Sequence, residues 1–336
     1  MRTSKFRFGW GKHALSVLLA YVFVSACTAT PAAVDPLPSW TDGATKQVIE
    51  RFIERVTTVG GPDYVPPQQR IAVFDNDGTL WSERPWVEGQ FKKYQIKKAA
   101  ERDPSRRDRQ PFKAAYENDL EYFETGGWPV ILGPARTITS EVSREHYDAE
   151  VESFFATQIH PGLEVPFQET IYQPVIELMT YLRANGFETF ICSGGGVDFM
   201  RVMSSELYGI EPYQVIGTSL VKELQIVDGR SILVTKDELD LFNNKDQKAV
   251  SIDLHIGLRP LLVMGNEGGR GDIGMLGYSQ GRDGISMQLL INHDDEIREF
   301  AYAEDDDASL NAAKKNGWLV VSMKDDWLSI YPTEEK

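Results

Sequence analysis

The sequence is short of the residues that disulfides, transition-metal sites and nucleic-acid surfaces require. Its 336 residues include two cysteines, Cys27 and Cys192, and five histidines. Two cysteines allow one internal disulfide at most, and the histidines have no spacing typical of a transition-metal site. Lysine and arginine number 35 against 50 acidic residues, which gives a formal net charge of -15. An acidic chain lacks the basic face that neutralises phosphates, which argues against a nucleic-acid partner.

The N-terminal region also lacks an apolar run long enough to span a bilayer comfortably. Basic residues precede the run ALSVLLAYVFV, and this order is typical of an export signal. The run ends at VSAC, residues 24–27, which resembles a bacterial lipobox and implies that the thiol of Cys27 receives a lipid. The alternative is a signal peptide cleaved nearby, with Cys27 discarded. Both interpretations predict an exported protein and leave Cys192 without a disulfide partner.

We therefore expect residues 1–27 to be a signal peptide with a lipobox and residues 28–40, rich in proline and alanine, to be a tether. The lipobox predicts a lipoprotein anchored to the membrane and facing the periplasm or the cell exterior. Beyond the tether, 42% apolar residues over the whole chain are enough to fill a substantial core, so the mature region is expected to fold without disulfides.

The pattern beyond residue 40 predicts an α/β fold with a Rossmann-like parallel sheet. Short apolar runs alternate with helical patterns, which is typical of a sheet covered on both faces. From about residue 84 to 165 the sequence instead shows polar, aromatic-rich helical segments without a strand-like run. We therefore assign residues 41–83 and 166–336 to the α/β core and residues 84–165 to a helical insertion after the first strand. The expected strands are IAVFD, FETFIC, PLLVMG, GISMQLLIN and WLVVSM.

Polar residues follow several of these strands, at the edge where ligands of such sheets bind. Asp75 ends the first strand, Ser193 follows FETFIC, and Asn266 follows PLLVMG, whereas Lys248 opens a helix. Asp77 stands two residues after Asp75, and two carboxylates this close repel each other unless a cation lies between them or one keeps a proton. Both arrangements suit phosphoryl transfer, in which one acid attacks phosphorus and the other protonates the leaving oxygen.

These residues carry a resemblance to the phosphatases of the haloacid dehalogenase superfamily. FDNDGTLW is similar to the first motif of that family, TFICSGGGVDFM to the second, QKAV to the third and LLVMGNEGGRGDIGML to the fourth. Within the superfamily, the likeness is greatest to the phosphoserine-phosphatase-like and phosphorylcholine-phosphatase-like bacterial hydrolases. The resemblance spans residues 70 to about 325, and it implies that the helical insertion is a cap that closes over the site.

The resemblance assigns roles to the aspartates and to the phosphate-binding residues. Asp75 is expected to attack phosphorus, and Asp77 to protonate the leaving alcohol and then activate water. Ser193 and the amide of Gly194 are expected to bind phosphate oxygens together with Lys248. The dehalogenases of the superfamily lack the second acid, so its presence favours a phosphatase or a phosphotransferase.

The fourth motif departs from the usual family pattern. Asn266 stands where many relatives have aspartate, and EGGRG separates it from Asp272 by more than the common spacing. The resemblance implies a Mg²⁺ ion held by Asp75, Asp77, Asn266 and Asp272, since a hard cation prefers such oxygen ligands. Which of Asn266, Glu267 and Asp272 binds it directly is left open by the sequence.

Two further assignments involve alternatives. NNKDQKAV offers both Lys245 and Lys248 as the site lysine, and we favour Lys248 because it stands at the helix entrance before a strand. The loop that follows Asp75, hereafter the nucleophile loop, is followed by Trp81, Glu83 and Trp86. Relatives place residues that contact the substrate at this point of the chain. This cluster is predicted to bind an amine or quaternary ammonium, whereas the alternative is that the tryptophans pack the insertion against the core.

The sequence thus predicts a magnesium-dependent phosphomonoesterase that acts on a small phosphorylated metabolite through an aspartyl-phosphate. One alternative is a phosphotransferase or mutase that uses the same intermediate. The other is a lipoprotein that binds phosphorylated ligands without turnover, which the unusual fourth motif suggests.

Overall fold

The computed structural model describes residues 34–332 except residues 128 and 269. The chain divides into the units Met1–Asp35 and Pro36–Lys336, and the fold below is that of the second unit. The predicted signal peptide, the lipobox with Cys27 and the first part of the tether lie outside the described residues. Within the part of the chain that is described, no helix is both long and apolar enough to cross a membrane.

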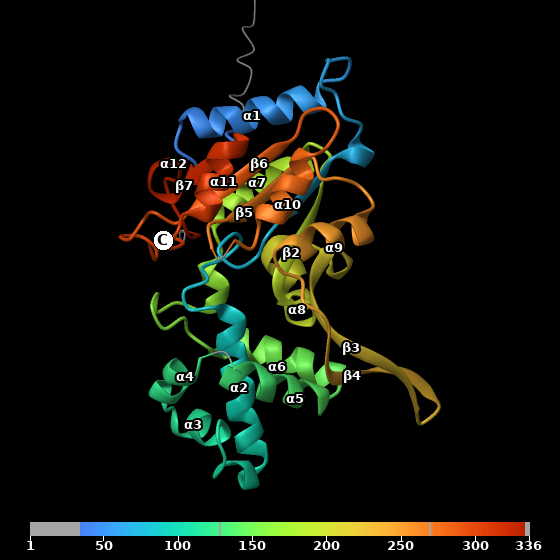
Figure 1. Cartoon of the computed structure of the whole chain (residues 1–336), viewed down its shortest axis with the longest axis vertical. Helices are drawn as coiled ribbons and strands as arrows, with labels where there is room; N and C mark the ends of the chain where they lie inside the picture. The colour runs from blue at the N-terminus through green and yellow to red at the C-terminus, as the bar shows by residue number, and fades with distance from the viewer. Residues whose placement is uncertain (1–33, 128, 269, 333–336) are drawn as a thin grey trace, which may run out of the picture. The chain divides into compact units, whose positions relative to one another are not determined.

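The core is a single sheet with the strand order β4-β3-β2-β1-β5-β6-β7 (Figure 1). All neighbouring strands are parallel except the antiparallel pair β3 and β4. The central strand β1 is buried along its whole length, which explains its uninterrupted apolar sequence. The strands are β1 (Ile71–Phe74), β2 (Glu188–Gly196), β3 (Val215–Val227), β4 (Arg230–Leu241), β5 (Leu262–Asn266), β6 (Met287–Asn292) and β7 (Leu319–Ser322).

Helices cover both faces of the sheet, as the alternating pattern predicts. Ala72 and Phe74 of β1 belong to a core cluster with side chains of α1, α7 and α8, whereas Ile71 and Val73 belong to a second cluster with α9, α10 and α11. Successive side chains of a strand point to opposite faces, so the two clusters lie on opposite sides of the sheet. These helices are α1 (Ala44–Thr57), α7 (Gln173–Ala184), α8 (Val197–Tyr208), α9 (Asp246–Ile256), α10 (Ile273–Gln280), α11 (Ala308–Asn316) and the short α12 (Met323–Asp326).

The insertion between β1 and α7 is helical. It contains α2 (Val87–Arg102), α3 (Phe112–Glu117), α4 (Leu120–Gly126), α5 (Pro129–Ser140) and α6 (Arg144–Thr157). Short 3-10 helices lie at Pro67–Gln69, Pro104–Arg106, Phe167–Thr170 and Pro212–Gln214. Phe91 of α2 stacks on Phe199 of α8 with ring centroids 5.0 Å apart, so the insertion, hereafter the cap, shares a hydrophobic cluster with the core.

Two details of the cap go beyond the sequence pattern. The segment FKAAYENDLEYFE lies in the region expected to be helical, and it forms two short helices, α3 and α4. Asn118 adopts a left-handed conformation with φ 57° at the end of α3, and the Asp119 side chain accepts a hydrogen bond from the backbone N–H of Tyr122. Helix α5 was not predicted, because Gly133 and Pro134 interrupt its helical pattern.

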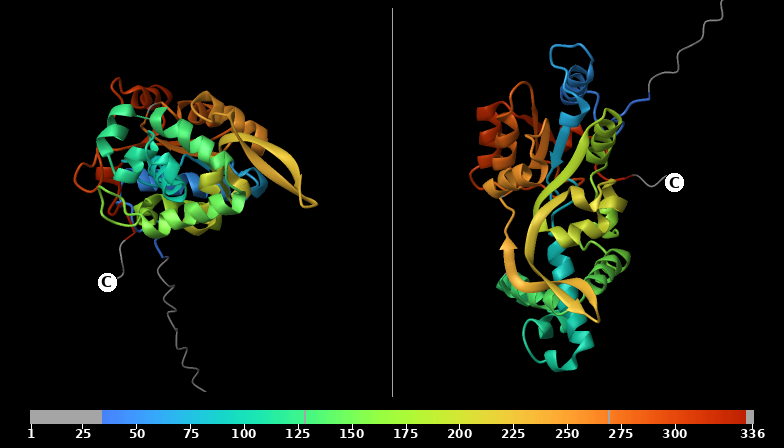
Figure 2. Two further views of the ribbon diagram at one scale, coloured as in Figure 1. Left: turned by 90° about the horizontal axis from the view of Figure 1, so that it is seen from below. Right: turned by 90° about the vertical axis from the view of Figure 1, so that its right-hand side faces the viewer.

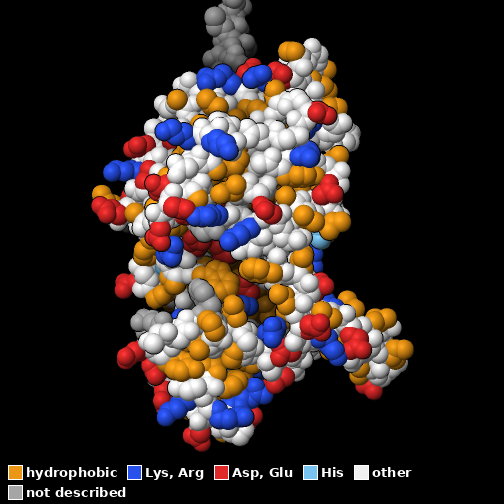
Figure 3. All heavy atoms as spheres, viewed as in Figure 1, with side chains coloured by type: hydrophobic (Ala, Val, Ile, Leu, Met, Phe, Trp, Pro, Cys, Tyr) orange, Lys and Arg blue, Asp and Glu red, His pale blue; other side chains and the backbone are white. Residues whose placement is uncertain are grey.

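Strands β3 and β4 form one long hairpin (Figures 1 and 2). Its turn uses Asp228 and Gly229, both with positive φ, which suits a tight two-residue hairpin. The far part of the hairpin exposes apolar side chains, including Leu233, which is 61% exposed (Figure 3). Nearer its base the hairpin meets the cap, where Arg136 of α5 forms an ion pair with Asp237 of β4.

Candidate active site

The nucleophile position lies at the carboxyl end of β1, beside a lysine. Asp75 is 7% exposed, and its Oδ1 atom lies 2.6 Å from the Nζ atom of Lys248. Burial, together with the negative charge of Asp272, raises the pKa of Asp75 to about 8 although Lys248 acts against this shift. Burial lowers the pKa of Lys248, but Asp272 and Asp75 outweigh it, so this pKa is raised and the ammonium stays charged. Lys245 is exposed at the start of α9 and makes no such contact.

Asp77 is held by two tryptophan side chains. Its Oδ1 atom accepts a hydrogen bond from Trp81 Nε1 at 2.8 Å, and its Oδ2 atom accepts one from Trp86 Nε1 at 3.3 Å. Burial, together with the charges of Glu83 and Glu88, raises the pKa of Asp77 to about 7, although the two indole donors act against this shift. A carboxyl group that titrates near neutral pH can both give and take a proton, which suits a general acid and base.

The end of β2, which runs directly into α8, presents backbone amides beside these acids. Ser193 is buried, and its Oγ atom accepts a hydrogen bond from Gly195 N at 3.1 Å. Gly196 N donates to Glu88 Oε2 of the cap at 2.8 Å. Asn243, which the sequence analysis missed, donates from Nδ2 to the carbonyl oxygen of Ser193 at 2.9 Å. Ser193 and Gly194 therefore lie just before the N-terminus of α8, a position where an anion such as phosphate is stabilised, whereas the Gly195 and Gly196 amides already bond Ser193 and Glu88.

The fourth motif orders its residues by hydrogen bonds within the protein. The two carboxylate oxygens of Asp272 contact Lys248 Nζ at 2.6 Å and the backbone N–H of Asn266 at 2.9 Å. Gly265 makes room for this contact, since a Cβ atom there would lie 2.4 Å from Asp272 Oδ2. Glu267 accepts a hydrogen bond from the backbone N–H of Glu304. Asp272 thus positions Lys248 and Asn266, whereas the Asn266 side chain closes on the nucleophile loop at Thr79, 3.5 Å away.

The oxygen donors at this edge fit a hard divalent cation. The described residues hold no group of three or more histidine, cysteine or acidic side chains arranged around one point, so any such site must include other donors. Asp75, Asp77 and the amide oxygen of Asn266 are of the type that Mg²⁺ prefers. Burial and neighbouring acidic side chains raise the pKa values of both aspartates, and a bound cation would offset this excess of buried negative charge.

Trp81 and Trp86, two residues of the predicted substrate cluster, meet at the Asp77 carboxylate, but the three members of the cluster have different further contacts. Trp81 is buried and packs against Phe155, Phe199 and Tyr208, so it supports the core in addition to holding Asp77. The Glu83 carboxylate lies toward the fourth motif, where a Cβ atom at Gly268 would be 3.3 Å from its Oε1 atom. Trp86 lines a cavity, and the other two residues do not.

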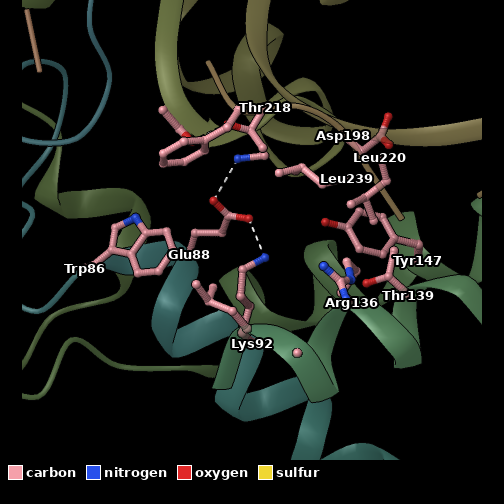
Figure 4. A pocket seen from close by; sticks show the side chains of 15 residues that line it. Trp86, Glu88, Lys92, Arg136, Thr139, Tyr147, Asp198, Thr218, Leu220 and Leu239 are labelled. Atoms are coloured by element: carbon pink, nitrogen blue, oxygen red, sulfur yellow. Dashed lines mark hydrogen bonds and ion pairs between the residues drawn. The ribbon is translucent and has the colours of Figure 1, made fainter. Parts of the chain in front are cut away.

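That cavity has a volume of about 400 Å³ and lies among the cap, the loop after β2 and the base of the hairpin (Figure 4). Most of its lining was not predicted from the sequence. Glu88 and Lys92 are four residues apart on α2, a spacing that the sequence shares with ordinary solvent-exposed ion pairs. The lining residues are Trp86, Glu88, Lys92, Leu132, Gly133, Arg136, Thr139, Tyr147, Gly194, Gly196, Asp198, Thr218, Leu220, Leu239 and Phe242.

Comparison with solved structures supports the fold. The chain is similar to a protein of unknown function from Anaerococcus prevotii, with 15% identity and a TM-score of 0.52 over 82% of this chain and 91% of that chain. A protein of unknown function from Bordetella pertussis shares 15% identity over 75% and 98% of the two chains, with a TM-score of 0.46. A phosphoserine phosphohydrolase-like protein from Francisella tularensis shares 16% identity over 75% and 94%, with a TM-score of 0.38.

No curated protein matches the sequence, but a family model does. Residues 69–231 match the haloacid dehalogenase-like hydrolases, and this range contains the Asp75 and Asp77 pair, the cap and the loop at Ser193. The α/β fold predicted from the sequence is confirmed by the observed sheet. The family match confirms the resemblance seen in the motifs: residues 69–231 are similar to the haloacid dehalogenase-like hydrolases.

Proposed function

We propose that the protein hydrolyses a small phosphomonoester through an aspartyl-phosphate on Asp75, with Mg²⁺ as cofactor. The observation that carries this proposal is the arrangement at the end of β1. The Asp75 carboxylate lies 2.6 Å from the ammonium of Lys248, and Asp77 beside it has a pKa of about 7. One acid is therefore placed to attack phosphorus and the other to move a proton, while a fixed positive charge stands at the point of attack.

In the first half of the reaction, an oxygen of Asp75 bonds to phosphorus as the bond from phosphorus to the alcohol oxygen breaks. Asp77 gives its proton to that oxygen, so the alcohol leaves neutral. In the second half, Asp77 takes a proton from water as the water oxygen attacks the phosphorus of the aspartyl-phosphate. The bond to Asp75 breaks, inorganic phosphate leaves, and both carboxyl groups return to their starting states.

Ser193, the Gly194 amide and Lys248 bind the phosphoryl oxygens, whose negative charge spreads in the transition state. Asp75 and Asn266 would hold Mg²⁺, which when bound neutralises phosphate charge and favours the ionised form of Asp75. Asp272 keeps Lys248 and Asn266 in place through its two hydrogen-bonded oxygens.

A phosphate-release assay tests this proposal against its alternatives. Purified protein with Mg²⁺ should release phosphate from simple monoesters, and excess chelator should abolish the release. After acid quench of a reaction with radiolabelled substrate, the label should be found on the peptide that contains Asp75. Phosphate transfer only to an added alcohol would indicate a phosphotransferase. Ligand-induced thermal stabilisation without phosphate release would indicate a binding protein.

We also propose that the mature protein is tethered to a membrane through a lipid on Cys27. The support is the order of basic residues, apolar run and VSAC in the sequence. Cells expressing the full chain with a labelled fatty acid should yield labelled protein in the membrane fraction, and Cys27→Ser should yield none. If the wild-type protein, with Cys27 in its sequence, were unlabelled and absent from the membrane fraction, an ordinary cleaved signal peptide would be indicated instead.

A further inference from the structure

The cavity described above lies on the side of the site where the alcohol must leave. In the proposed reaction, Asp77 protonates the alcohol oxygen, so the alcohol extends from phosphorus toward that carboxyl group. Trp86 donates a hydrogen bond to Asp77 Oδ2 and lines the cavity. A Cβ atom at Gly195 would lie 3.2 Å from Glu88 Oε2 and 3.6 Å from Asp77 Oδ2. The general acid and the cavity wall therefore flank the same glycine, so an alcohol that extends past Asp77 would meet the cavity.

The walls of this cavity are largely apolar and come mainly from the cap and the hairpin. Aromatic and aliphatic side chains project into it from the cap and from the hairpin (Figure 4). The cap contributes Trp86, Leu132 and Tyr147, and the hairpin with its following loop contributes Leu220, Leu239 and Phe242. Transfer of an apolar alcohol from water to such a lining is favourable. A polar alcohol must instead replace its hydrogen bonds to water by hydrogen bonds to the walls.

The charged groups of the lining are already paired within the protein. The Glu88 carboxylate lies 2.6 Å from the Lys92 ammonium and also accepts the Gly196 amide (Figure 4). Each of the other two charged lining residues also has a partner: Arg136 pairs with Asp237, and Asp198 pairs with Lys222 at 2.7 Å and with Arg144. A cationic alcohol would have to compete with Lys92 for the buried Glu88 carboxylate, which already has its partner.

We propose that the substrates are phosphomonoesters of uncharged, apolar alcohols, aliphatic or aromatic, and that this cavity selects them. This inference rests on the proposed phosphatase function and names its substrate class. It differs from recognition of an ammonium group, which the cluster of Trp81, Glu83 and Trp86 suggested in the sequence. Only Trp86 of that cluster reaches the cavity, and the carboxylate that accompanies it there, Glu88, already binds Lys92.

Two substrates of equal shape test the proposal directly. 3,3-Dimethylbutyl phosphate and phosphocholine differ in one atom, a carbon in place of the charged nitrogen. With purified protein and Mg²⁺, kcat/KM should be at least tenfold higher for the dimethylbutyl ester. Choline is the better leaving group of the two, so intrinsic reactivity acts against this result. Equal values, or a preference for phosphocholine, would overturn the proposal. Failure to release phosphate from any ester, ethyl phosphate included, would overturn the phosphatase function itself.

A charge placed in the wall should reverse the preference. Leu239 lines the cavity and is 47% exposed, so Leu239→Asp adds a carboxylate without disrupting a buried core. We expect the ratio of kcat/KM for the dimethylbutyl ester to that for phosphocholine to fall at least tenfold. Leu233→Asp is the matched control, since Leu233 is on the same strand outside the lining, and its ratio should not change.

A truncation separates packing from charge. Leu239→Ala should lower kcat/KM for the dimethylbutyl ester severalfold and lower it less for ethyl phosphate, whose smaller alcohol buries less apolar surface. Leu239 variants that keep the wild-type ratio for all three esters would show that the alcohol does not enter the cavity, and would overturn the inference while leaving the phosphatase function intact.

Discussion

The two sides of the active site are built in different ways. On the phosphate side, Asp75, Ser193 and Lys248 are buried at strand ends or at a helix start of one sheet. On the alcohol side, side chains such as Tyr147 and Leu239 come from the cap and the hairpin, which meet through packing and an ion pair. The sheet fixes charged groups where the reacting phosphorus needs them, whereas the cap and hairpin leave an apolar space. The comparison indicates that chemistry and choice of substrate reside in separable parts of the chain.

The largest expected effect comes from the nucleophile. Asp75→Asn keeps the size of the side chain and removes the attacking carboxylate, so turnover should fall by roughly three orders of magnitude or more on every ester. Phosphate release from dimethylbutyl and ethyl phosphates measures the loss, and a thermal melt checks that the variant is folded. A folded variant with substantial activity on either ester would require another nucleophile and would remove the basis of the comparison.

Asp77→Asn should separate the two half-reactions. An alkoxide needs a proton as it leaves, whereas nitrophenolate does not, so alkyl esters should react about 100-fold to 10,000-fold more slowly. With p-nitrophenyl phosphate, rapid mixing should show one burst of about one nitrophenolate per active site, followed by slow turnover. If both leaving groups were slowed equally in the first turnover, Asp77 would not be the general acid and the cavity would lose its link to the alcohol.

Metal binding should respond to Asn266 more than to its neighbour. Asn266→Ala removes an oxygen donor, so the Mg²⁺ concentration for half-maximal activity should rise about 10-fold to 100-fold, in the range known for altered metal surroundings. Glu267→Gln is the control, because the Glu267 carboxylate faces the backbone of Glu304. The reverse order in a magnesium titration would transfer the ligand role to Glu267 and leave Asn266 as a loop residue.

The sequence was most informative on the phosphate side because strand ends can be located from apolar runs. Asp75 and Ser193 follow such runs, and their meeting at one edge follows from parallel strands alone. The choice between Lys245 and Lys248 rested on helix position, and the structure shows Lys248 at the nucleophile. The position of the third motif's lysine could therefore be predicted. Its contact with Asp272 could not, because the long loop between Asn266 and Asp272 does not fix where the Asp272 side chain lies.

The alcohol side could not be predicted in the same way. Glu88, Tyr147 and Leu239 are far apart in the sequence, and they share the cavity only because the cap and hairpin close on the same loop. Helix α5, which supplies Leu132, has Gly133 and Pro134 inside it and gives no clear helical pattern. No local sequence motif indicates that these residues lie together. The aromatic residues next to Asp75 were the only part of the substrate site that the sequence suggested, and of these Trp86 lines the cavity.

The smallest expected effect tests whether the alcohol side is neutral because Glu88 and Lys92 cancel. Glu88→Gln keeps an acceptor for the Gly196 amide and removes the charged partner of Lys92. The ratio of kcat/KM for 2-phosphoglycolate, a monoester with an anionic alcohol, to that for dimethylbutyl phosphate should therefore rise severalfold. Lys92→Gln leaves Glu88 unpaired, and phosphocholine should gain instead. The double variant restores neutrality and should return both ratios toward their wild-type values, because the two changes act on one ion pair.

Ethyl phosphate serves as the reference substrate that reports the phosphate side alone. Additive rather than compensating changes in the double variant would show that Lys92 and Glu88 act independently, and the alcohol side would then be selective through shape and not through cancelled charge.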